Sequence, residues 1–300
     1  TRGAGPHPGV RGDGGRHIVT RVSEPDEPTA FFDVDGDALV PSPWAQGPWG
    51  ATVSGHIMGG LLGWAVERAG GDADLVPARL TVDLLRPTAM APLRVETSVR
   101  REGKRIKVVD AEVLQNDIVV SRASSVFLRR GDHPDGEVWG SPTVMPPIPD
   151  DSAVSTDEMP FVLWAFGSDT EAGTLGGTGT EWQQAGLRKF AWVRELRPLI
   201  TGDPMTPFVR VALAGDVTSA LTHWGTSGLR YINADFTMTL SRLPDGPYIG
   251  LASDGHHGSD GIASGSATLF DRHGPIGHSI AIALAQPAGS FRPPGRLGLK

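Results

Sequence analysis

The residue types that could do chemistry in this chain are limited to oxygen and nitrogen groups. The 300 residues include no cysteine, which excludes a thiolate nucleophile, thiolate metal ligands and disulfides. The G-x-S-x-G motif of many serine hydrolases is also missing. Any catalysis must therefore depend on carboxylates, hydroxyls, imidazoles, amides or backbone groups.

Three polar clusters have part of the pattern of a ligand site. Residues 254–260 contain two aspartates and two adjacent histidines, but adjacent histidines in a Gly-rich loop lack the usual ligand geometry. The run DVDGD from Asp33 lacks the glutamate of a calcium loop. The run GTLGGTGTEW from Gly173 lacks the lysine of a phosphate loop. We interpret each as a turn or loop, and we predict no metal site and no cofactor.

The segment SGHIMGG offers backbone chemistry, because it opens a predicted helix. The first turn of a helix has free N–H groups and a dipole that favours negative charge. Gly55 would let a substrate approach this turn, and His56 projects from it. Gly59 is a third candidate for substrate binding. Close packing of the helix explains Gly59 and Gly60 equally, and a place in the core explains His56 equally.

An internal repeat organises the elements that must position these groups. At an offset of 156 residues (237 − 81 = 156), Thr81 aligns with Thr237 and Arg86 with Arg242. The spacing holds without gaps up to turns at 116 and 273, where the second copy gains one residue. The chain is therefore expected to contain two similar halves.

Each copy has the pattern of one helix and several strands. A run with helical spacing starts at Thr52 and ends at Gly70 and Gly71, a helix stop, and alternating runs separated by turn residues follow. In the second copy, PFVRVALAGDVTSALTHW is the helical run. The first strands are expected in AFFDVDGD and RKFAWVREL. The pattern predicts an α+β fold with antiparallel sheets.

The domain boundaries follow from the repeat and from composition. We predict a flexible leader (1–24), an N-terminal domain (25–130), a linker (131–179), a C-terminal domain (180–288) and a tail (289–300). The linker is rich in Pro, Asp, Gly and Ser, and its segment EMPFVLWAFG is expected to form a short helix or a packing segment.

Composition excludes several classes of protein. The leader lacks the apolar core of a secretory signal, and no apolar run approaches the ~20 residues of a membrane span. A net charge of −7 argues against a nucleic-acid partner, although the basic run 100–107 could bind one small anion. The lack of cysteine suits a cytoplasmic protein.

Three stretches carry a resemblance to a known family: GHIMGGLLGWAVERA, DLLRPTAMAPLRVETSVRREGKR, and INADFTMTLSRLPDGPYIGLAS with DGIASGSATLFDRHGPIGHS. Over roughly residues 28 to 288, the chain resembles the thioesterase-like superfamily of double hot-dog proteins, which includes the type II acyl-CoA thioesterases. The resemblance implies a double hot-dog, in which two antiparallel sheets each wrap around a central helix.

The resemblance also implies a set of catalytic residues. In the related enzymes, an aspartate on the strand after the second helix activates water, and Asp235 stands at that position; the alternative is a solvated aspartate at a strand end. A hydroxyl residue on the next strand corresponds to Asp254 by register or to Ser253 by chemistry, and both stay open, as does a turn role for Asp254. The family glutamine has no counterpart, because Ile280 or Ile282 stands at its place.

These observations predict an acyl-CoA thioesterase that releases free acid and CoA by Asp-activated water, in fatty acid metabolism. The alternative is a non-catalytic acyl-CoA or lipid-binding double hot-dog protein, which the missing glutamine favours. An acyl-CoA hydratase ranks last, because the Asp and His of its motif are not visible. Acyl-CoA is the expected partner, and a homodimer is one option for the assembly.

Overall fold

The computed structural model describes residues 29–71, 74–140, 142–152, 154, 159–168, 174–175 and 180–292. The predicted leader (1–24) and residues 293–300 of the predicted tail lie outside this part of the chain. None of the helices in the described ranges has the length and apolar character of a membrane span.

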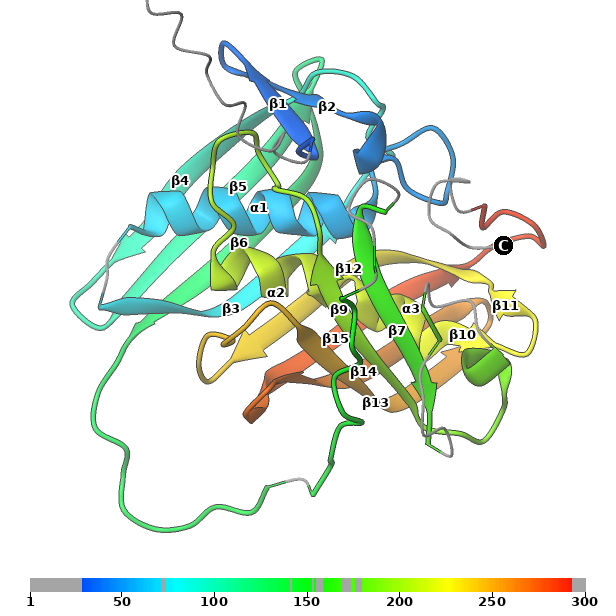
Figure 1. The fold of residues 1–300 in the computed structure, drawn as a ribbon. Coiled ribbons are helices and arrows are strands. Elements are labelled where there is room, and N and C mark those ends of the chain that lie inside the picture. The colour runs from blue at the N-terminus through cyan, green and yellow to red at the C-terminus, as the bar shows by residue number, and fades with distance from the viewer. Residues whose placement is uncertain are drawn as a thin grey trace, which may run out of the picture.

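The first half of the fold is one buried helix on four antiparallel strands, of which the first pairs with the last (Figure 1). Helix α1 spans Gly55–Gly70, and its cap Gly71 has a left-handed φ of 39°, which confirms the predicted helix stop. α1 is apolar on most sides because the sheet covers one side and a second helix covers another. The strands are β3 (Leu75–Leu84), β4 (Arg94–Glu102), β5 (Ile106–Gln115) and β6 (Ile118–Arg129).

The predicted first strand of this half forms a separate hairpin. β1 (Phe32–Asp35) pairs with β2 (Ala38–Pro41), and the turn between them uses Gly36 at a φ of 63°. The hairpin joins the sheet through a bridge between Leu39 and Leu93. The run DVDGD is thus a hairpin turn, and the short helix η1 (Pro43–Ala45) follows it.

The second half repeats this four-stranded arrangement with β12 (Tyr231–Leu240), β13 (Ile249–Ser259), β14 (Ile262–Asp271) and β15 (Gly274–Ala285). The predicted first strand is β9 (Lys189–Glu195), which pairs with β13. β7 (Phe161–Gly167) pairs with β9, so the segment expected to be a short helix or packing segment is a strand of the sheet. Its aromatic and β-branched residues suit a strand. The short elements are β8 (Thr174–Leu175), η2 (Thr180–Gln183), β10 (Trp224–Gly225) and β11 (Gly228–Leu229).

The helical run of the second half is broken, whereas we expected one continuous helix. α2 (Pro207–Gly215) and α3 (Val217–His223) meet at Asp216. Asp216 keeps helical dihedral angles, but its carbonyl accepts from Ser219 N at 3.1 Å in a tighter, three-residue turn. This break gives Asp216 a place at a helix junction.

Within the described residues, the two halves share one sheet of eleven strands, in the order β4-β5-β6-β3-β12-β15-β14-β13-β9-β7-β8. The separate sheets that we expected are joined edge to edge by the antiparallel pair β3 and β12. Thr81 lies directly opposite Thr237, and Thr237 Oγ1 donates to Thr81 Oγ1 at 3.0 Å. The residues that the repeat aligns therefore meet each other on the pseudo-twofold axis.

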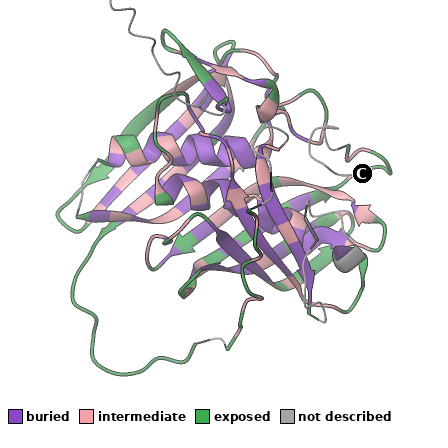
Figure 2. Ribbon diagram, in the orientation of Figure 1, coloured by how far each residue is buried: buried purple, intermediate pink, exposed green. Residues whose placement is uncertain are grey.

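Glycines let the two central helices pack closely. A Cβ on Gly60 would lie 2.4 Å from Leu213 Cδ2, and one on Gly63 would lie 2.6 Å from Ala212 Cβ. Figure 2 shows the buried residues concentrated on α1, α2 and the inner face of the sheet. The core is therefore a layer between the curved sheet and the helix pair.

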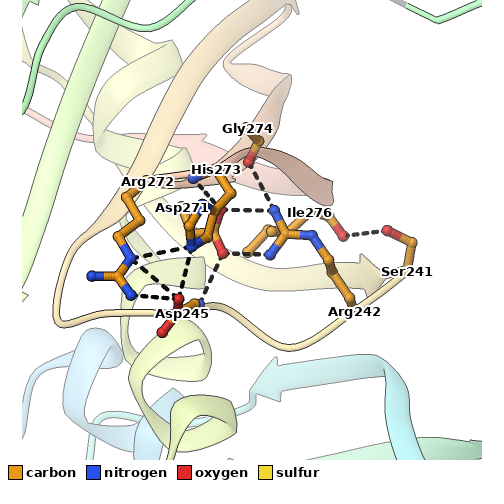
Figure 3. A network of polar contacts seen from close by, with 8 residues as sticks. All are labelled: Ser241, Arg242, Asp245, Asp271, Arg272, His273, Gly274 and Ile276. Atoms are coloured by element: carbon orange, nitrogen blue, oxygen red, sulfur yellow. Dashed lines mark hydrogen bonds and ion pairs between the residues drawn. The ribbon is translucent and has the colours of Figure 1, made fainter.

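A polar network joins the loop after β12 to the turn between β14 and β15 (Figure 3). Arg242 donates two hydrogen bonds to the carboxylate of Asp271, which also accepts from the backbone N–H groups of Asp245 and His273. Burial by itself raises the pKa of Asp271, but these donors lower it to about 2. Arg242, one of the repeat markers, thus has a structural role here.

Candidate active site

An apolar cavity of about 150 Å³ lies where the two halves meet. Its wall combines the first turn of α1, the junction of α2 and α3, and the start of β12. Four tryptophans line it, together with one group of polar residues: His56, Asp216 and Asn233, with Gly55 beside them. Convergent polar groups in an apolar cavity are typical of a ligand site.

Asp216 is the acidic residue of this cavity. Its Oδ1 accepts a hydrogen bond from Asn233 Nδ2, while Oδ2 accepts none from the described residues. Burial raises the pKa of Asp216, and the hydrogen bond from Asn233 and the charge of His56 oppose the shift. A carboxylate with a raised pKa and one free oxygen can take a proton from water.

A β-bulge aims Asn233 at this carboxylate. The register of β12 against β15 shifts between Asn233 and Asp235. Without the shift, both side chains would leave the strand on the same face. The bulge instead turns Asn233 inward, to Asp216, and leaves Asp235 on the other face.

The N-terminus of α1 faces the same carboxylate. The first helical hydrogen bond runs from Met58 N to Ser54 O at 2.9 Å, so the N–H groups of residues 55–57 have no partner within the helix. A Cβ on Gly55 would lie 2.9 Å from Asp216 Oδ1. Glycine therefore allows the carboxylate to approach the helix end more closely than a residue with a Cβ would.

His56 forms a buried ion pair with a residue of the second half. Its Nε2 lies 2.9 Å from Glu195 Oε1, and both side chains are almost fully buried. Burial by itself lowers the pKa of His56, but the carboxylate of Glu195 and the charge of Asp216 raise it above its ordinary value. The pair with Glu195 therefore favours the protonated imidazole beside the carboxylate of the cavity.

The residues predicted for substrate binding are divided by the structure. Gly55 and His56 line the cavity, but Gly59 does not. A Cβ on Gly59 would lie 2.8 Å from the ring of Phe236 and 3.1 Å from the carbonyl of Ala212. The packing interpretation of Gly59 accounts for its surroundings.

Asp235 lies outside the cavity. Its neighbour Phe236 is fully buried under the helices, so the alternation of β12 directs Asp235 to the outer face of the sheet. There Asp235 Oδ1 accepts from Ile282 N at 2.9 Å, opposite Asp83. Burial and the charge of Asp83 raise the pKa of Asp235, although this hydrogen bond lowers it. The carboxylate thus has a structural partner and no access to the cavity wall.

Ser253 and Asp254 belong to a different, polar depression of about 520 Å³. Ser253 Oγ accepts from Lys189 N at 3.0 Å, and Asp254 forms an ion pair with Arg188 at 2.7 Å. The structure therefore does not bring Asp235, Ser253 and Asp254 together around one cavity. The described residues also hold no group of three or more His, Asp or Glu placed to bind a metal ion.

The sequence reasoning missed Asp216, Asn233 and Glu195. One signal was available for Asp216: it is the only charged residue in the apolar helical run VALAGDVTSAL. A buried helix includes such a carboxylate only where the carboxylate has a partner or a task. Asn233 and Glu195 had no comparable signal, because their orientation depends on a bulge and on the packing of the two halves.

Comparison with known protein families finds two matching models, which together cover most of the chain. The family model of the acyl-CoA thioesterase N-terminal domain matches residues 40–128, and that of the C-terminal domain matches residues 142–284. No curated protein sequence matches the chain significantly.

Solved structures are similar over most of their length. The tesB protein of Mycobacterium avium subs paratuberculosis has a TM-score of 0.59 and 16% identity, over 85% of this chain and 96% of that one. An acyl-CoA thioesterase II from Mycobacterium marinum has a TM-score of 0.57 and 16% identity, over 86% and 95%. A conserved protein with a hot-dog fold from Alicyclobacillus acidocaldarius has a TM-score of 0.54 and 14% identity, over 85% and 96%. These likenesses confirm the predicted α+β double hot-dog fold.

Proposed function

Because the chain belongs to the acyl-CoA thioesterase family, whose members are thioester hydrolases, we propose that it hydrolyses an acyl-CoA in the apolar cavity, with the Asp216 carboxylate as general base. One observation carries the proposal: Asn233 holds Asp216 against the open N-terminus of α1, inside an apolar wall. A base, a group that orients it and backbone donors are the parts that attack of water on an acyl group needs.

The reaction proceeds by transfer of one proton and exchange of one bond. Asp216 Oδ2 takes a proton from water as the water oxygen bonds to the thioester carbonyl carbon. The carbonyl oxygen becomes an oxyanion, which the free N–H groups of residues 55–57 stabilise together with the helix dipole. The carbon–sulfur bond then breaks, the CoA thiolate takes the proton from Asp216, and a free carboxylic acid remains.

His56 supports this site through charge. Glu195 pairs with His56 and raises its pKa, and the charge of His56 in turn opposes the rise in the pKa of Asp216 that burial causes. In this scheme the pair favours the ionised form of Asp216, which is the form that can act as a base. His56 is a positioning residue in this scheme, and Glu195 holds it.

Substitution of two aspartates separates this scheme from the one implied by the resemblance. Asp216→Asn keeps the shape of the side chain but removes the base, so kcat should fall by roughly 10²–10⁴-fold. Asp235→Asn should change kcat by less than about threefold, because Asp235 lies on the outer face of β12. Thiol release from an acyl-CoA gives both rates without background, since the chain contains no cysteine.

The opposite pattern, with activity lost only in Asp235→Asn, would reject Asp216 as the base and return the role to Asp235. Asp254→Asn and Ser253→Ala extend the comparison to the other predicted residues. If the wild type releases no more thiol than Asp216→Asn on any acyl-CoA, the non-catalytic binding protein becomes the better interpretation. A cytoplasmic location, a role in fatty acid metabolism and a homodimer stay predictions.

A further inference from the structure

The cavity wall is unusually aromatic. Eight of its lining residues are Trp, Phe or Tyr, although these types make up only 7% of the chain. Trp182 packs edge-to-face on Trp224 with ring centroids 5.8 Å apart. Phe161 lies 5.1 Å from the imidazole of His56, at the polar end of the cavity. Aromatic rings therefore surround the place where an acyl group would extend from the base.

The C-terminal segment closes part of this wall. Phe291 packs edge-to-face on Trp224 at 5.3 Å and on Trp49 at 5.4 Å, so it bridges two rings of the cavity. The backbone N–H of Arg292 donates to the carbonyl of Pro48 at 2.7 Å, which fixes the segment on the loop before α1. Trp49 and Phe291, which we call the closing pair, come from opposite ends of the chain.

The charges along the cavity wall disfavour an acyl group that carries a negative charge of its own. None of the described lining residues is Lys or Arg, and His56 is already paired with Glu195. The acidic residue Asp216 repels a carboxylate. An acyl chain that ends in a carboxylate would thus lose its hydration without gaining a cationic partner.

The volume limits the acyl group as well. An apolar cavity of about 150 Å³ in another protein holds one benzene molecule. The present cavity has a similar volume of about 150 Å³ and an aromatic wall. Ring-on-ring contacts favour an aryl group beyond the area that it buries.

We propose that this site takes a compact, uncharged acyl group, with aryl groups favoured, and that the closing pair Trp49 and Phe291 sets the upper limit of its size. This rests on the proposed hydrolysis only for its assay. The fit of an acyl group to the cavity is a property of binding and can be measured without turnover.

The substrate test uses matched acyl-CoAs and the full chain. We expect kcat/KM for phenylacetyl-CoA to exceed that for palmitoyl-CoA, kept below its micelle concentration, by at least about tenfold. Hexanoyl-CoA should exceed adipoyl-CoA, which has the same chain length but ends in a carboxylate, by at least about a hundredfold. Equal values within either pair would overturn the proposal.

The closing pair is tested by Phe291→Ala and Trp49→Ala. Each should raise the ratio of kcat/KM for palmitoyl-CoA over phenylacetyl-CoA by about tenfold. Trp139→Ala is the matched control, because Trp139 is 87% exposed and does not line the cavity; it should leave the ratio unchanged. If Phe291→Ala fails to fold, as judged by its thermal melt, Phe291→Leu replaces it. An unchanged ratio in folded variants of both positions would reject the closing pair as the size limit.

A binding measurement separates this proposal from the proposed function. Four tryptophans line the cavity, so their fluorescence reports a bound acyl group. If no acyl-CoA is hydrolysed, saturable quenching by phenylacetyl-CoA but not by palmitoyl-CoA would support the aryl pocket and reject hydrolysis. Quenching that does not distinguish the two would reject the aryl pocket, whatever the result of the hydrolysis assay.

Discussion

Replacing Gly55 with alanine tests the geometry of the site by adding one methyl group. The new Cβ would lie 2.9 Å from Asp216 Oδ1 and 3.0 Å from Leu84 Cδ1. Leu84 can rotate away, but Asp216 is held by Asn233 and by the helix junction. The carboxylate must therefore move, and its hydrogen bond to Asn233 must lengthen.

The size of the effect follows from these distances. Ordinary contacts of a Cβ begin at 3.4 Å, so the carboxylate must move by about 0.5 Å (3.4 − 2.9 = 0.5). A displacement of ~1 Å at a reacting group costs up to ~10²-fold in rate, so half of it is expected to reduce kcat about tenfold. The free energy of unfolding should change by less than about 1 kcal/mol, because alanine favours the helix that it joins.

Two other Gly→Ala variants are the controls for this measurement. Gly60→Ala places a methyl group 2.4 Å from Leu213, away from the cavity, and should lower the free energy of unfolding by roughly 1–2 kcal/mol with little change in kcat. Gly131→Ala meets no atom within 4 Å and should change neither quantity. The assays are thiol release under saturating substrate and unfolding in urea.

An unchanged kcat in Gly55→Ala would refute the reasoning, since it would mean that the position of the Asp216 carboxylate does not control the rate. A loss of activity that only follows a loss of stability would refute it as well. The specific expectation is a slower enzyme that is as stable as the wild type.

Three further predictions concern pH and packing. The proposed base Asp216 can act only when ionised, so activity should fall as pH drops through its raised pKa. Asn233→Leu removes the hydrogen bond that lowers this pKa and should therefore move the acid limb of the kcat profile to higher pH. Asp271 has a pKa of about 2 against about 4 in an unfolded chain, so its stabilisation is present above about pH 4 and is lost between about pH 4 and 2. This amounts to roughly 2 kcal/mol, which Asp271→Asn should remove at neutral pH in urea unfolding. Thr81→Val and Thr237→Val should each cost about 1 kcal/mol in the same assay, and the double variant should cost less than the sum because the two hydroxyls share one hydrogen bond.

Much of the fold could be predicted because short sequence patterns specify its helices, strands and turns. The alignment of Thr81 with Thr237 anticipated the axis between the halves, and Gly70 and Gly71 ended α1 where expected. The pairing of β3 with β12 was not predictable from either half, since each strand alone has the pattern of any strand in an antiparallel sheet. The break of the second helix at Asp216 was missed because its residues keep helical spacing throughout.

The site was harder to predict than the fold. The N-terminus of α1 was identified because a glycine and a histidine at a helix start are visible in sequence. The carboxylate was assigned to Asp235 because the family resemblance places an aspartate on the strand after the second helix, but one bulge turns Asn233 inward and leaves Asp235 on the outer face. A bulge depends on the tertiary contacts of both neighbouring strands, and no residue type in the run INAD signals it.

The repeat also explains why the described part of the chain contains one complete site rather than two. The counterpart of Asp216 at the offset of 156 is Gly60, which has no carboxylate. The side chain of Leu213 occupies the space that a side chain at Gly60 would need. In the proposed site, one half supplies the helix N-terminus and the other half supplies the carboxylate, so the two similar halves have different roles. Neither half alone contains both parts of the proposed site. Separating or exchanging the halves should therefore abolish the proposed hydrolysis, even where each half keeps its fold.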